Sequence, residues 1–172
     1  MAFTNTLKLP PVMILFRTLL ALCLLCSFAA AQEVSADRAA AQSMKSMAIW
    51  ESEKSLQNLQ DGDTRAILAK IAPKVDYYDK GRIPTPAVRA ELEKYFNRWS
   101  DRKFSNVRTA IDEWDVYRGV YQIGVKVDFT WTVKDSSGKT KSGKSRLHLV
   151  WKGRTNDDLS LVSWNETVNP ML

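Results

Sequence analysis

Apolar and polar residues alternate over residues 120–134, and this pattern is the strongest structural signal in the chain. The odd positions carry seven apolar or aromatic side chains, from Tyr121 to Val133, whereas the even positions from Gln122 to Lys134 are polar apart from Gly124. Successive side chains of a β-strand point to opposite faces. The pattern therefore predicts a long strand with one buried face and one wet face, and the buried face needs a large partner surface.

Two helices are predicted ahead of this strand. Residues 35–60 are rich in Ala, Met, Gln, Glu and Lys and contain no Gly or Pro, which favours a helix. Gly62 can take the left-handed conformation that ends a helix, and Asp63 can cap the next one. The second helix is expected over residues 64–72, where Pro73 stops it.

A third helix is predicted over residues 85–99. Thr85 supplies a capping hydroxyl, and Pro86 suits the first helical position. One apolar stripe follows at helical spacing, made of Val88, Leu92, Tyr95, Phe96 and Trp99. We expect this stripe to cover the buried face of the long strand.

The remaining patterns predict strands over residues 75–78, 103–117, 142–152 and 159–168, with a turn at residues 80–82. The last four strands, counting the long one, are joined by short turns, so they should pair antiparallel. Helices grouped ahead of such a meander indicate the α+β class. The expected order is α-α-β-α-β-β-β-β.

The N-terminus has the pattern of a secretory signal peptide. Lys8 and Arg17 precede an apolar run over residues 18–31 that ends in small residues, and the first acidic residue is Glu33. The run is shorter than the roughly 20 residues of a membrane span. We therefore expect a leader over residues 1–31, a helical lead-in over 32–45 and one domain over 46–172. The protein should be periplasmic or secreted, without a stable membrane anchor after cleavage.

The composition of the chain argues against several classes of function. Both cysteines, Cys23 and Cys26, lie in the leader, so the mature domain has no disulfide and relies on its core. The chain carries a net charge of +6, which falls by two when Lys8 and Arg17 are removed. This charge is too diffuse to indicate nucleic acid as a partner. With a single histidine, His148, we expect neither a transition-metal site nor a cofactor.

Three stretches resemble the nuclear transport factor 2-like (SnoaL-like) superfamily: residues 67–81, 86–99 and 159–166. The resemblance covers about residues 46–168. It implies a cone-shaped domain in which a curved antiparallel sheet wraps around helices. The superfamily contains isomerases, dehydratases, cyclases, hydrolases and non-catalytic domains, so the resemblance does not settle the activity.

In such a cone, the candidate ligand-binding residues are Tyr77, Tyr95, Arg98, Trp99, Trp131 and Glu166. Core packing is the more common use of such aromatic side chains, and interaction with the helix dipole is the more common use of an arginine at a helix end, such as Arg98. By alternation, Tyr77 should point inward, and Asp76 and Tyr78 outward. Glu166 shares a face with Trp164, which makes it the better pocket carboxylate. His148 should lie on the outer face.

These observations favour a non-catalytic exported domain that binds a small apolar or anionic ligand or a partner protein, with a homodimer through the sheet face as a further possibility. The alternative is an isomerase, dehydratase or cyclase that uses a pocket carboxylate. The two hypotheses differ in whether a carboxylate faces an apolar cavity.

The leader generates the first prediction. Because small residues close the apolar run, the exported protein should begin at Gln32. N-terminal sequencing of the protein from a periplasmic fraction checks this, and a chain that still begins at Met1, or that carries lipid on Cys26, contradicts it.

Overall fold

The computed structural model describes residues 37–170, with side chains up to Val168. The expected leader, its cleavage before Gln32 and the first two residues of the expected first helix lie outside the described residues. The chain divides into two units, residues 1–41 and 42–172. Only residues 37–41 of the first unit are described, and they are helical.

The N-terminal helix occupies residues 37–61, in agreement with the predicted helix over the described range. It ends at Gly62, whose φ of 77° is the left-handed conformation that glycine adopts at low cost. Asp63 then caps α2 (Thr64–Ala69), because its side chain accepts a hydrogen bond of 2.9 Å from the Ala66 amide.

Helix α2 is shorter than predicted, and β1 (Ile71–Tyr77) begins before the proline that was expected to stop the helix. The Lys70 carbonyl leaves the helix and accepts a hydrogen bond of 2.7 Å from the Leu161 amide. Pro73 lies inside β1, between Ile71 and Asp76, where the register of the pairing between β1 and β6 shifts. A proline is tolerated there because no ladder hydrogen bond requires its missing N–H.

The third helix, α3 (Thr85–Arg98), begins where predicted but is capped differently. The Thr85 hydroxyl donates to the Ala72 carbonyl at 3.0 Å and so ties the helix to β1. A short 3-10 helix, η1 (Tyr78–Lys80), and the small strand β2 (Arg82–Pro84) precede α3 where only a turn was predicted.

Helix α3 faces only one end of the long strand, where its Tyr95 lines a cavity together with Phe129, Trp131 and Val133. Its contacts are mainly with α2 and β1, and fewer with β2 and β3. The N-terminal helix is the element that lies across the long strand. Its Ser52 side chain contacts Trp151 of β5, and its Gln60 side chain accepts a hydrogen bond from the Phe104 amide of β3. The long strand lies between β3 and β5, so this helix crosses it.

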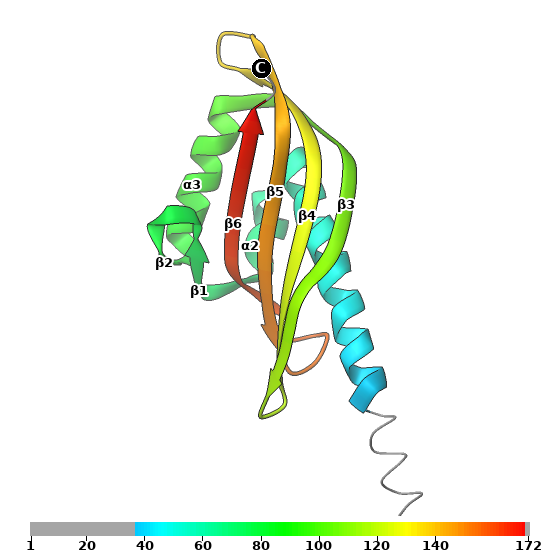
Figure 1. Cartoon of the computed structure of the whole chain (residues 1–172). Helices are drawn as coiled ribbons and strands as arrows, with labels where there is room; N and C mark the ends of the chain where they lie inside the picture. Colours follow the sequence, from blue (N-terminus) through cyan, green and yellow to red (C-terminus); the bar gives the residue numbers. More distant parts are fainter. Residues whose placement is uncertain (1–36, 171–172) are drawn as a thin grey trace, which may run out of the picture. The chain divides into compact units, whose positions relative to one another are not determined.

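The remaining strands are β3 (Trp99–Tyr117), β4 (Val120–Asp135), β5 (Thr140–Gly153) and β6 (Ser160–Pro170). They form one six-stranded sheet with β1 and β2, in the order β2-β1-β6-β5-β4-β3. All pairs are antiparallel except β1 and β6, which run parallel, whereas a fully antiparallel sheet was expected. The helices lie on one face of the sheet (Figure 1), so the α+β class is confirmed.

Strand β4 has the two faces that its alternation predicted. Its inward side chains between Ile123 and Phe129, and Val133, are at most 4% exposed, whereas Tyr121 and Trp131 near its ends are half-buried. The inward row of β5 continues the same surface with three fully buried side chains: Leu147, Leu149 and Trp151. These rows form the centre of the core.

The contact between helix and sheet generates the second prediction. Trp151 is fully buried, and its Nε1 donates to Ser52 Oγ at 2.8 Å. Trp151→Phe removes this hydrogen bond and leaves a gap, so it should lower the free energy of unfolding by about 1–3 kcal/mol. Trp50→Phe, at a side chain that is 55% exposed, should cost under about 0.5 kcal/mol. Urea unfolding that gave equal losses for the two variants would contradict this role of Trp151.

Candidate functional site

The parallel pairing of β1 and β6 brings a carboxylate and a tyrosine together. Tyr77 pairs with Trp164, and Glu166 follows two residues later on the same inward face of β6. The Tyr78 hydroxyl donates to Glu166 Oε2 at 3.2 Å. Glu166 is therefore an inward-facing carboxylate with a phenol as its partner, whereas Asp76 is exposed on the outer face, as the alternation predicted.

Tyr78 was expected to point outward with Asp76, and this prediction is wrong. The backbone leaves the strand at Tyr78, where φ is +51°, and η1 begins there. The alternation of side chains ends with the strand, so the ring turns toward β6. The turn is closed by a hydrogen bond of 3.0 Å from the Tyr77 amide to the Gly81 carbonyl.

A cavity of about 190 Å³ opens beside Glu166, at the end of the sheet where β6 terminates (the upper end in Figure 1). It is lined by residues of the N-terminal helix, the end of α3 and strands β3, β4 and β6: Leu59, Tyr95, Trp99, Phe104, Phe129, Trp131, Val133, Glu166 and Val168. The cavity is partly open to solvent, and Val168 in its wall is 49% exposed.

A second hollow, of about 450 Å³, adjoins the cavity. Tyr95, Trp99, Leu59 and Glu166 line both spaces, and the second one adds the following residues: Tyr77, Tyr78, Asp79, Lys80, Glu91, Leu92, Lys94, Arg98 and Trp164. The larger space is polar at its rim, whereas the smaller one is mainly apolar. Together they can accept a ligand with an apolar end and a polar end.

The charges at the polar rim are largely paired with one another. Glu91 accepts from Lys94 at 2.9 Å and lies 3.1 Å from Lys80, and these hydrogen bonds lower the pKa of Glu91. The Arg98 guanidinium is placed over the Trp99 ring, 4.8 Å from its centroid. Arg98 lines the larger space and does not line the apolar cavity.

Three tyrosines near Glu166 are held in their neutral form. Burial, followed by the negative charge of Glu166, raises the pKa of Tyr95 to about 12. Burial likewise raises the pKa of Tyr77 and Tyr78 above the usual range, with Glu166 contributing in each case. At neutral pH these phenols act as hydrogen-bond donors and acceptors, and not as anions.

The structure thus divides the six candidate residues into two groups. Tyr95, Trp99, Trp131 and Glu166 line the apolar cavity, whereas Tyr77 and Arg98 line only the larger space. Sequence reasoning missed Tyr78 because of its positive φ, and missed Phe104 because bulges in β3 interrupt the alternation on both sides of it. Phe129 and Val133 were available from the alternation in β4 as inward side chains.

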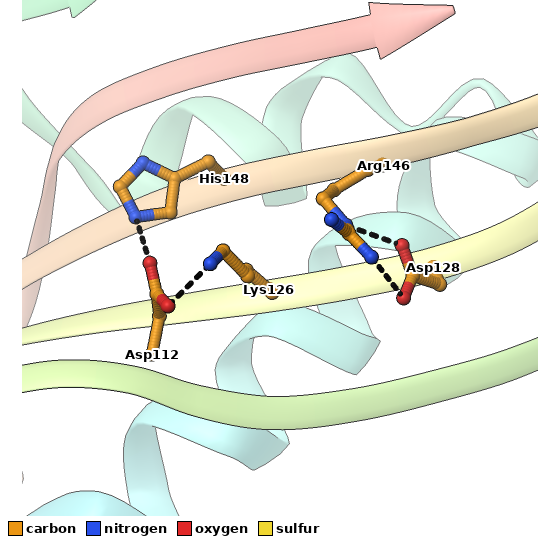
Figure 2. A network of polar contacts seen from close by, with 5 residues as sticks. All are labelled: Asp112, Lys126, Asp128, Arg146 and His148. Carbon is orange, nitrogen blue, oxygen red and sulfur yellow. Dashed lines mark hydrogen bonds and ion pairs between the residues drawn. The ribbon is translucent and has the colours of Figure 1, made fainter. Parts of the chain in front are cut away.

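The outer face of the sheet carries a separate polar network (Figure 2). Arg146 forms two hydrogen bonds with Asp128, of 2.7 and 2.9 Å, across β4 and β5. Asp112 is paired with Lys126, and His148 Nε2 lies 3.3 Å from Asp112 Oδ2. The hydrogen bond from Lys126 lowers the pKa of Asp112. His148 is therefore on the outer face, as predicted, away from the cavity.

Within residues 37–170, no three His, Cys, Asp or Glu side chains are grouped so that they could hold a metal ion. In the same part of the chain, none of the helices combines the length and the apolar character needed to cross a membrane.

Comparisons with known proteins show the fold. No family model and no curated protein matches the sequence. Among solved structures, a nuclear transport factor 2-like superfamily protein from Salmonella enterica has a TM-score of 0.60 and 15% identity, over 75% of this chain and 93% of that one. A ketosteroid isomerase-like protein from Erwinia carotovora has a TM-score of 0.53 and 8% identity, over 74% and 94%.

A third solved structure, ActVI-ORFA from Streptomyces coelicolor, has a TM-score of 0.51 and 14% identity, over 72% of this chain and 96% of that one. The domain therefore has the nuclear transport factor 2-like (SnoaL-like) fold, as the resemblance implied. At these identities the likeness concerns the fold alone, so the function must be argued from the site.

The buried tyrosines generate the third prediction. A tyrosine whose pKa is higher in the folded than in the unfolded state stabilises the fold below its ordinary pKa, and this contribution is lost as pH rises toward the folded value. For Tyr95 the window runs from 10.0 to about 12. The melting temperature should fall across this window, and the fall should be smaller in Tyr95→Phe. An identical fall in both proteins would show that Tyr95 does not contribute.

Proposed function

We propose that this domain binds a small, mainly apolar ligand in the cavity beside Glu166 and that it does so without catalysis. The observation that carries the proposal is the cavity wall, which combines aromatic rings with one carboxylate. Ligand sites are typically apolar hollows with a few placed polar groups that fix the orientation of the ligand. Tyrosine and tryptophan suit such walls because they offer large apolar area on stiff side chains.

The size of the cavity limits the ligand. An apolar cavity of about 150 Å³ is enough to hold a benzene molecule, and this one measures about 190 Å³. One ring or a compact branched group fits, and a larger ligand would extend into the neighbouring polar space. An anionic ligand would have to place its charge near Arg98, because Glu166 repels a negative charge in the cavity itself.

The leader pattern supports a periplasmic or secreted location for this binding activity. A domain that works there without disulfides depends on its core for stability. The buried rows of β4 and β5 provide that core independently of the cavity. Exchange of a cavity ligand therefore need not disturb the folded domain.

A second candidate function is proton transfer with Glu166 as the base. It is favoured by one observation, an inward carboxylate with neutral tyrosines around it at an apolar cavity. We favour binding because the Tyr78 hydroxyl already donates to Glu166 Oε2 at 3.2 Å, so one of the two oxygens that a base would use is occupied by the protein itself. The experiment that separates the two follows exchange of the α-protons of cyclopentanone in D₂O by NMR. Exchange that the domain accelerates and that Glu166→Gln abolishes would establish catalysis.

The proposed cavity generates the fourth prediction. Benzyl alcohol, which has one ring and one hydroxyl donor, should raise the melting temperature of the domain by mass action. Trp131→Leu removes part of the aromatic wall and should weaken binding about tenfold, measured by titration calorimetry. Trp50→Leu is the matched control, because the same substitution is made at an exposed tryptophan outside the cavity.

Two outcomes would count against the proposal. If a panel of single-ring compounds left the melting temperature unchanged, the cavity would not be a ligand site and a partner protein would become the better hypothesis. If Trp131→Leu and Trp50→Leu weakened binding equally, the ligand would be binding elsewhere.

A further inference from the structure

The apolar cavity is unusual in the number of aromatic rings that surround it. Five of its nine lining residues are aromatic, and they come from α3, β3 and β4: Tyr95, Trp99, Phe104, Phe129 and Trp131. Phe104 and Phe129 are in ring contact, with centroids 5.0 Å apart and planes tilted by 59°. The face of an aromatic ring carries partial negative charge and attracts cations, most strongly in tryptophan.

The only charged group in the cavity wall is negative. Glu166 lines the cavity, and the Tyr78 hydroxyl donates to its Oε2. Its Oε1 accepts no side-chain hydrogen bond from any of the described residues. One oxygen of the carboxylate is therefore held in place by the protein while the other remains available to a ligand.

The nearby cations are held outside the cavity. Arg102 donates to the Leu59 and Gln60 carbonyls at the end of the N-terminal helix, at 3.2 and 3.1 Å. Lys141 pairs with Asp135 at 3.6 Å, and Arg98 lines the neighbouring space. Among the described residues, no lysine or arginine lines the cavity.

The Trp99 ring already attracts two of these cations. The Arg98 guanidinium carbon lies 4.8 Å from its centroid and Lys141 Nζ lies 5.1 Å from it. The net charge of +6 is spread over the whole chain and is screened beyond about 10 Å in salt. The cavity wall itself presents five rings and Glu166, and both favour positive charge.

We propose that the ligand of this cavity is an organic cation, with a compact amine or quaternary ammonium group held among the aromatic rings and next to Glu166. This inference rests on the proposed function, because it assigns the chemical class of the ligand to the same cavity. A volume of about 190 Å³ suits a trimethylammonium-sized group, and any longer part of the ligand extends toward the polar space.

The test compares two probes of the same shape that differ in charge. Choline carries a trimethylammonium group, and 3,3-dimethyl-1-butanol has the same outline with a neutral carbon in place of nitrogen. Titration calorimetry on the domain should give choline a dissociation constant at least about tenfold lower than that of the alcohol. Shape and apolar area are matched, so the difference reports on the charge.

Two variants locate the effect. Glu166→Gln keeps the size of the side chain and should remove most of the preference for choline over the neutral alcohol. Glu93→Gln, at an exposed position of α3 that does not line the cavity, is the matched control and should change neither affinity. Trp131→Leu should weaken the binding of choline more than that of the alcohol, because it removes the face of an aromatic ring.

The outcomes separate this inference from the proposed function. If the alcohol binds as tightly as choline, or more tightly, the cation assignment is wrong while the cavity remains a ligand site. If choline is preferred but Glu166→Gln and Trp131→Leu leave that preference intact, the cation binds elsewhere and the assignment is also wrong. If choline, the alcohol and benzyl alcohol all fail to bind at millimolar concentration, both proposals fail.

Discussion

The hydrogen bond between Trp151 and Ser52 is the contact on which the arrangement of helix and sheet depends. Trp151 stands near the end of the buried row of β5, and its indole N–H would be costly to bury without a partner. Ser52 Oγ accepts that hydrogen bond, and its hydroxyl donates a second one to the Ala48 carbonyl one turn earlier in the helix. Both polar groups are thereby satisfied inside the core, and the N-terminal helix is fixed in rotation and height over the sheet.

Fixing this helix also fixes one wall of the cavity. Leu59 lies two turns beyond Ser52, and the end of the helix is held by Arg102, which donates to the Leu59 and Gln60 carbonyls. Gly62 lies beside this contact with a φ of 77°, a left-handed conformation that other residues adopt only with strain. The cavity is therefore framed by a helix anchored to β5 at one point and to β3 at another, so its shape is largely preformed.

The two faces of the sheet have different chemistry because they have different neighbours. The inner face meets helices and is apolar except where Glu166 and the tyrosines face the cavity. The outer face has no helix over it among the described elements, and it carries ion pairs such as Asp128 with Arg146. Exposed pairs of this kind add little stability. The polar residues with consequences for binding are accordingly those on the inner face.

The sequence by itself determined which side chains of each strand face the core. Alternation identified the buried row of β4, placed Glu166 inward, and placed Asp76 and His148 outward, because a strand has a period of two whatever it packs against. It also placed the N-terminal helix over its described range and the start of α3, since helix propensity and the proline in the first turn of α3 are local properties.

Only the tertiary structure decided which residues meet across the chain. The parallel pairing of β1 with β6, the positive φ of Tyr78 and the bulges of β3 depend on partners far away in sequence, and no local pattern encodes them. These same features bring Tyr78 to Glu166 and Phe104 into the cavity wall. The sequence thus determined the faces of the elements, whereas long-range pairing determined the site, because a binding cavity is a property of how elements meet.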